Sequence, residues 1–223
     1  MKVRTLTRIA LLALLAVPLL VASAGAGTIS YDLVGVDSAG DPVAARIDFT
    51  TLTNSMTIDI TNLLAAGSVK NVGQNISGIQ FTLSSGQSSG ALNGTNPPNT
   101  QQSVLSTGFG FPLANVTGNP TGWSLQPDVD NGLGKGIGLC VACVAGNTQH
   151  TLIGGAPGAN YLNSDSSIRE PGSVSNPFFD NVLHFALNVP GVQGTATDPG
   201  DYVDSAFITF GTTQKTTLQG TAH

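Results

Sequence analysis

The sequence predicts an all-β fold, namely an antiparallel β-sandwich, jelly-roll-like or immunoglobulin-like, with long loops. Two observations carry this prediction. Apolar and polar residues alternate in short runs separated by turn-forming residues, and 28 Gly and 12 Pro favour turns over long helices. Because alternation with a period of two buries only one face of a strand, each predicted strand needs a second sheet to cover its apolar side.

A β-hairpin is predicted over residues 45–61, with a turn at residues 51–55. Its expected core-facing residues are Ile47, Phe49, Met56, Ile58 and Ile60. Further strands are predicted where the same alternation returns, at residues 29–33, 79–83, 183–189 and 206–210. Two short windows suggest a helix instead, residues 63–69 and 136–145.

Two segments are predicted to be long loops, residues 84–122 and 154–177, because both are rich in Ser, Gly, Asn and Pro. The first also carries a weak hairpin pattern around residues 104–113. Loops of this length are uncommon in a compact domain unless they are functional or disordered. We therefore expect any binding surface to lie on these two loops.

The N-terminus has the three parts of a secretory signal. Basic residues at Lys2, Arg4 and Arg8 precede an apolar run over residues 9–21, and the small residues Ala22-Ser23-Ala24 follow as an A-x-A cleavage site. This predicts a signal peptide over residues 1–24 and a single β-sandwich domain over residues 25–223. The apolar run is shorter than the roughly 20 residues of a spanning helix, so no stable membrane span is expected after cleavage. The expected location is secreted or extracytoplasmic: periplasm, cell surface or medium.

The charge balance excludes two classes of partner. Removal of the signal leaves five Lys or Arg against 13 acidic residues, a net charge of −8. A chain this acidic lacks the basic surface that nucleic-acid binding requires. It also lacks a basic patch for anionic lipid.

Several short motifs are expected to have structural roles. Residues 86–90 match G-x-S-x-G, but the sequence after them will not start the helix that a nucleophile elbow requires. Cys140 and Cys143 form C-V-A-C, and in an exported protein we interpret the pair as a disulfide that closes a small loop. The histidines, which share no metal-binding or triad spacing, are His150, His184 and His223.

Two acidic clusters are candidate calcium sites. Asp128 and Asp130 precede Gly132, while Asp201 and Asp204 lie in the sequence DPGDYVD. Calcium takes six to eight oxygen ligands, often from Asp and Asn on turns. Solvated turns without metal are the alternative, because Asx residues also stabilise turns directly. Calcium is the one cofactor that the sequence brings into consideration.

Five segments that cover most of the mature chain carry a family resemblance. They are ARIDFTTLTNSMTIDITN at 45–62, VGQNISGIQFTLSSG at 72–86, GGAPGANYLNSDSSI at 154–168, NPFFDNVLHFALNVPGV at 176–192 and DSAFITFGTT at 204–213. Together they resemble exported bacterial proteins of the PEP-CTERM (exosortase-sorted) class and their unanchored relatives. The resemblance implies an extracytoplasmic β-sandwich tied to an exopolysaccharide matrix, without catalytic residues. That class ends in a sorting tail, whereas this chain ends in QKTTLQGTAH, so we expect either release from the cell or a tail that has been lost.

Three functional hypotheses remain open from the sequence. The first is a non-enzymatic surface or matrix-associated protein that binds polysaccharide or envelope proteins, with Trp123 and Tyr161 as candidate ligand contacts. For Trp123 the competing interpretation is a packed core aromatic. The second hypothesis is a secreted glycan or ester hydrolase, with Asp128 or Asp130 as candidate acids. The third is a purely structural envelope component.

Overall fold

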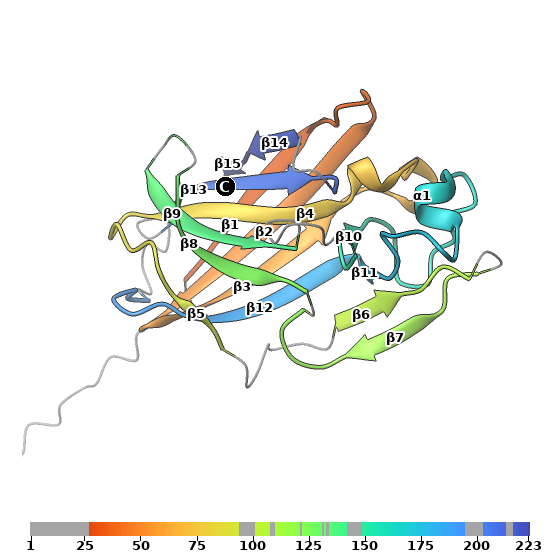
Figure 1. Ribbon diagram of the computed structural model, residues 1–223. Helices are drawn as coiled ribbons and strands as arrows, with labels where there is room; N and C mark the ends of the chain where they lie inside the picture. The colour runs from red at the N-terminus through yellow and green to blue at the C-terminus, as the bar shows by residue number, and fades with distance from the viewer. Residues whose placement is uncertain are drawn as a thin grey trace, which may run out of the picture.

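The computed structural model describes residues 27–93, 101–107, 110–120, 122–130, 132, 134–141, 149–194, 203–212 and 216–223. Within these ranges the chain is almost entirely β-structure, arranged as two packed sheets (Figure 1). The all-β prediction is therefore confirmed. The signal peptide predicted over residues 1–24 lies outside the described residues and stays a prediction.

The first sheet has six strands in the described part of the chain, in the order β15-β1-β2-β3-β12-β5, and all of its pairings are antiparallel. Its strands are β1 (Gly27–Val36), β2 (Pro42–Leu52), β3 (Ser55–Asn62), β5 (Ala91–Leu92), β12 (Val182–Asn188) and β15 (Thr221–Ala222). The predicted hairpin is β2 and β3. Its turn is shorter than predicted, because both strands continue until only Thr53 and Asn54 remain between them.

The second sheet, counted over the same residues, has nine strands. Seven follow one another in the order β14-β13-β4-β10-β11-β6-β7, and β9 lies on β4 and carries β8. They are β4 (Ile76–Leu83), β6 (Gln101–Val104), β7 (Leu113–Val116), β8 (Ser124–Asp130), β9 (Lys135–Cys140), β10 (Leu152–Ile153), β11 (Phe178–Asp180), β13 (Val203–Phe210) and β14 (Thr216–Gln219). The pairing of β10 with β11 is parallel, which departs from the purely antiparallel prediction.

The core lies between the two sheets and holds the residues that alternation predicted. All five core-facing residues predicted for the hairpin are buried. The ring of Phe49 on β2 lies 5.0 Å from that of Phe81 on β4, which joins the two sheets at their centre. Burying such side chains is the main contribution to stability, at about 1.5–3 kcal/mol each.

A second, smaller apolar cluster lies at one end of the molecule. Its buried members are Leu64, Val69, Val104, Ile153, Tyr161, Ile168 and Phe178. Much of the predicted loop 154–177 packs on this cluster and includes the short helix α1 (Ser166–Arg169). The predicted loop 84–122 holds β5 and the hairpin of β6 and β7, which confirms the weak hairpin pattern. Figure 1 shows that hairpin and α1 at the same end of the molecule.

The two helix-like windows have different outcomes. Residues 63–69 contain a single 3-10 turn, Ala66–Ser68, and a second turn, Val72–Gln74, follows. The window at 136–145 was wrongly predicted, because its first half belongs to β9 and most of its remainder lies outside the described residues. β9 shows no alternation since Gly136 to Cys140 are all buried. A Cβ atom on Gly136 would lie 2.3 Å from the carbonyl oxygen of Phe81, so glycine lets the two strands approach.

Candidate functional site

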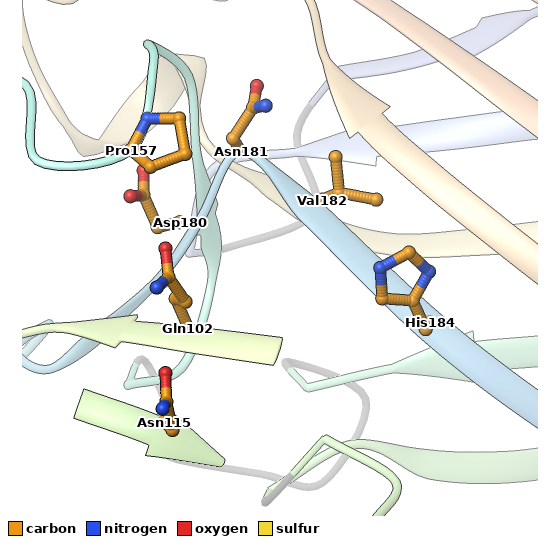
Figure 2. Close-up of a pocket in the computed structure, with 7 residues that line it drawn as sticks. All are labelled: Gln102, Asn115, Pro157, Asp180, Asn181, Val182 and His184. Carbon is orange, nitrogen blue, oxygen red and sulfur yellow. The ribbon is translucent and has the colours of Figure 1, made fainter. Parts of the chain in front are cut away.

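A pocket of about 300 Å³ opens beside the β6–β7 hairpin (Figure 2). Its volume is at the lower end of the range of about 300–1,000 Å³ that is usual for small-molecule sites. We call it the amide-lined pocket, and it is lined by Gln102, Asn115, Pro157, Asp180, Asn181, Val182 and His184. Five of the seven lining residues are polar, and apart from Asp180 and His184 their side chains are uncharged amides.

The pocket forms where the chain passes from one sheet to the other. β11 belongs to the second sheet and ends at Asp180, whereas β12 belongs to the first sheet and begins at Val182. Asn181 between them has a φ of 57°, a left-handed conformation that Asn tolerates better than most residues. Its backbone N–H donates to Ile153 at 3.0 Å, and its carbonyl accepts from the N–H of Asn62 at 3.0 Å. These bonds fix the residues on either side of the crossing.

Asp180 is the buried acid of the pocket. Its side chain is only 4% exposed, and its Oδ2 accepts a hydrogen bond from the N–H of Gly158 at 3.3 Å. The other oxygen, Oδ1, is fully buried and has no hydrogen-bond partner in the described residues. Burial raises the pKa of Asp180 to about 6, and the N–H of Gly158 and the nearby Tyr161 hydroxyl oppose that shift only in part.

Two side-chain amides stand on the neighbouring hairpin. Gln102 on β6 and Asn115 on β7 are direct cross-strand partners, so their side chains lie on the same face of the hairpin. Figure 2 shows the Gln102 amide pointing toward Asp180, with Asn115 on the far side of Gln102. Each amide offers both N–H donors and a carbonyl acceptor. The pair can therefore hydrogen bond to hydroxyl groups in either direction.

His184 borders the pocket from β12. Its Nδ1 lies 2.7 Å from Oδ1 of Asp59, which is its cross-strand partner on β3. Asp59 in turn stands opposite Asp48 on β2, and Asp48 accepts a hydrogen bond from Ser30 on β1. A polar row thus crosses four strands on the outer face of the first sheet and ends at the pocket. The carboxylate of Asp59 orients the imidazole of His184.

The two aromatic residues predicted as ligand contacts are both buried, which corrects that prediction. Trp123 is 5% exposed, packs on Phe185 at 5.4 Å between ring centroids and donates its Nε1–H to the carbonyl of His150 at 2.8 Å. Tyr161 is 1% exposed and donates its hydroxyl proton to the carbonyl of Gly154 at 2.8 Å. Each polar tip is satisfied by a backbone carbonyl, so neither ring offers a face to a ligand.

The calcium candidates are not brought together as one site. Asp128 and Asp130 are exposed on β8, where Asp128 accepts from the Ser88 hydroxyl at 2.6 Å and Asp130 accepts from the N–H of Gly132 at 2.9 Å. Asp204 is exposed on β13 in the second sheet, and Asp201 lies outside the described residues. Across the described ranges no three His, Cys, Asp or Glu side chains cluster as a metal site.

The two remaining motifs are the G-x-S-x-G segment and the cysteine pair. β5 follows the G-x-S-x-G segment where a nucleophile elbow would need a helix, as the sequence indicated. Cys140 is buried at the end of β9, and Cys143 lies outside the described residues, so the disulfide stays a prediction.

Sequence reasoning missed the residues of the amide-lined pocket. No spacing in the sequence assigned His184 a role, and Asp180 was not singled out. The available signal was the sequence FFDN at residues 178–181, in which an acid directly follows two large apolar residues. An acid inside such a run is a candidate for burial, and buried acids gather at functional sites.

Comparison with protein-family models, with curated proteins and with solved structures finds no match to this chain. The helices in the described ranges are too short to cross a membrane.

Proposed function

We propose that this chain is an exported, non-enzymatic surface or matrix-associated protein that binds polysaccharide through the amide-lined pocket. The observation that carries the proposal is the lining itself: three side-chain amides, a buried acid and an oriented imidazole around one small opening. Sugars present many hydroxyl groups close together, and such groups are held by side chains that both donate and accept hydrogen bonds.

The position of the pocket also supports polysaccharide binding. The β6–β7 hairpin falls within the segment 84–122, and Pro157 and Gly158 fall within 154–177, so the pocket joins the two loops in which binding was expected. The contacts differ from those expected, because amides and an acid replace Trp123 and Tyr161. Extracytoplasmic location rests on the signal sequence and on the resemblance to exosortase-sorted proteins.

The hydrolase and the purely structural hypotheses enter as alternatives. Hydrolysis by two carboxyl groups requires both to face one cleft. Asp128 and Asp130, which were the candidate acids, are exposed on β8 and do not line the amide-lined pocket. We therefore prefer binding without turnover.

The test is a pull-down of the mature chain, beginning at Gly25, on the extracellular polysaccharide of its own source organism. We expect saturable binding that falls at least tenfold in the double variant Gln102→Ala with Asn115→Ala. The matched control is Asn163→Ala, which removes an exposed amide from the loop 154–177 without touching the pocket. Urea unfolding of each variant separates lost binding from lost folding.

Each result distinguishes the hypotheses. Binding that survives the double variant would place the ligand elsewhere on the molecule. Release of new reducing ends from the polysaccharide would favour the hydrolase. Absence of binding by the folded wild type would leave the structural hypothesis, and a signal sequence that stays uncleaved on expression in a secreting bacterium would contradict export.

A further inference from the structure

The amide-lined pocket has an unbalanced charge. Of the residues that line it, Asp180 is acidic and His184 is tied to the acidic Asp59, whereas none is Lys or Arg. An acid this deeply buried usually has a cationic or multiply hydrogen-bonded partner. Asp180 has a single backbone donor, Gly158, and Tyr161 close by.

The unpartnered oxygen of Asp180 points to the kind of group that the pocket lacks. A carboxylate can accept about four hydrogen bonds, and leaving a buried acceptor without one destabilises the folded protein. The hydroxyl of Tyr161 cannot fill the gap while its single proton is donated to Gly154. Oδ1 is therefore short of a donor, and a positively charged donor would also offset the burial of the charge.

We propose that the amide-lined pocket binds a sugar that carries a protonated primary amine, with the ammonium group donating to Asp180 and the sugar hydroxyls bonded to Gln102 and Asn115. The inference rests on the proposed function and specifies its ligand as a hexosamine-type, deacetylated polysaccharide. Uronic acids are disfavoured, because their carboxylates would lie close to Asp180 with no Lys or Arg in the lining to pair with.

Calcium fits the pocket less well than an ammonium group. Calcium takes six to eight oxygen ligands and favours several carboxylates. The lining supplies one buried carboxylate and a few amide oxygens, and no three-residue acidic or histidine cluster occurs in the described chain. An ammonium group donates only three hydrogen bonds, so the carboxylate of Asp180 with one amide oxygen of the lining suits it better than it suits calcium.

Binding should depend on pH in a bell-shaped way. The titratable groups around Asp180 are Tyr161 close to it and, elsewhere in the lining, His184 on β12 with Asp59 beside it, while His150 packs against Phe179 of β11. On the acid side affinity falls as Asp180 takes up a proton, since its pKa is about 6 without ligand. On the alkaline side it falls as the amine loses its charge.

The test is calorimetric titration of the mature chain with two oligosaccharides of equal length, one of glucosamine and one of N-acetylglucosamine. Near pH 6.5 we expect glucosamine to bind at least tenfold more tightly. Asp180→Asn should abolish this preference and remove the acid limb of the pH profile. Gln102→Lys, on the partly exposed hairpin, should weaken glucosamine binding through like-charge repulsion. Asn163→Ala should change neither affinity.

Other results would overturn the inference in separable ways. If both sugars bound with equal affinity and this binding were lost in the Gln102→Ala and Asn115→Ala double variant, the proposed function would stand but recognition of the amine would be rejected. If neither sugar bound but the native polysaccharide still did, only the recognition of the amine would be rejected. Glucosamine binding that is unchanged in Asp180→Asn would indicate attraction to the acidic surface only. Calcium binding that is lost in Asp180→Asn would assign the pocket to a metal, and failure to bind any glycan would defeat both proposals.

Discussion

One buried side-chain amide, that of Asn62, links the two sheets at the end of the molecule that carries the pocket. Asn62 ends β3 in the first sheet, and its Nδ2 donates to the carbonyls of Gln74 and Leu152, each at 3.1 Å. Its Oδ1 accepts from the N–H of Leu64 at 3.2 Å. Leu152 begins β10 in the second sheet, so one side chain links both sheets next to the Asn181 crossing.

Substitution Asn62→Ala is expected to lower the free energy of unfolding by about 1–3 kcal/mol or more, because it leaves buried backbone groups without partners. Urea unfolding of the mature chain measures this. The matched control is Asn188→Ala, which removes an exposed amide from β12 and should change stability by less than about 0.5 kcal/mol. Equal effects of the two substitutions would mean that the buried amide contributes nothing specific.

Trp123 is expected to act through packing and not through ligand contact. Substitution Trp123→Ala removes a buried ring from its contact with Phe185 and leaves the carbonyl of His150 without its donor. We expect a loss of about 3–5 kcal/mol of stability. Polysaccharide binding, measured per folded molecule, should stay unchanged, whereas a loss of affinity at full stability would return Trp123 to the binding site.

At the scale of elements, the β2–β3 turn is set by one left-handed residue. Asn54 has a φ of 58°, and its Oδ1 accepts from the N–H of Gly191 at 2.9 Å. Its backbone also bonds to Val189 and Val192. The turn is therefore joined to the segment that leaves β12.

At Asn54 we expect glycine to be more stabilising than alanine, the reverse of their usual order in strands and helices. Both Asn54→Gly and Asn54→Ala remove the side-chain hydrogen bond, so their difference isolates the backbone conformation. Glycine usually destabilises a strand or helix relative to alanine by about 0.5–1 kcal/mol, but at a left-handed position alanine carries a cost of about 1–2 kcal/mol. We expect Asn54→Gly to unfold at a higher urea concentration than Asn54→Ala. The opposite order would show that the turn relaxes to a different conformation.

The sequence located the β2–β3 hairpin best, because both of its strands have one buried and one partly exposed face. β2 and β3 alternate strictly between buried and partly exposed residues, so the period-two pattern located them and their core residues. β9 is buried along most of its length and shows no such period, so its small and apolar residues suggested a helix. The turn was predicted over residues 51–55 but consists only of Thr53 and Asn54. The polar residue Thr51, which suggested a turn, is buried and continues β2.

At the scale of the whole molecule, the pocket could not be predicted, because it joins residues that are distant in the chain. Gln102 and Asn115 come from a hairpin in the first predicted loop, whereas Asp180 and His184 lie on strands of different sheets. The antiparallel pairing of β6 with β11 places the hairpin beside Asp180, and the chain crossing at Asn181 places His184 on the other sheet. The aromatic ligand contacts were wrongly predicted for the complementary reason, since the burial of Trp123 and Tyr161 depends on packing that composition does not specify.

The buried acid should make the stability of the whole molecule depend on pH. The pKa of Asp180 rises from 3.8 to about 6 on folding, so the folded protein binds this proton more tightly than the unfolded chain does. Its contribution to stability is therefore fully present below about pH 4 and is lost as the pH rises through about 6. Substitution Asp180→Asn removes the charge and with it this loss.

We expect Asp180→Asn to be more stable than the wild type at pH 7.5, by on the order of 1–3 kcal/mol, and the advantage to vanish near pH 4. Urea unfolding at both values of pH measures the difference, and subtracting the wild-type curve cancels groups that are common to both proteins. Asp204→Asn, which removes an exposed carboxyl group from β13, reports the change that the loss of one surface charge brings. If Asp180→Asn were less stable at both values of pH, the ionised carboxylate would be satisfied in the folded protein by donors beyond Gly158. That result would remove the physical reason for a cationic ligand, because the pocket would then hold no unbalanced charge.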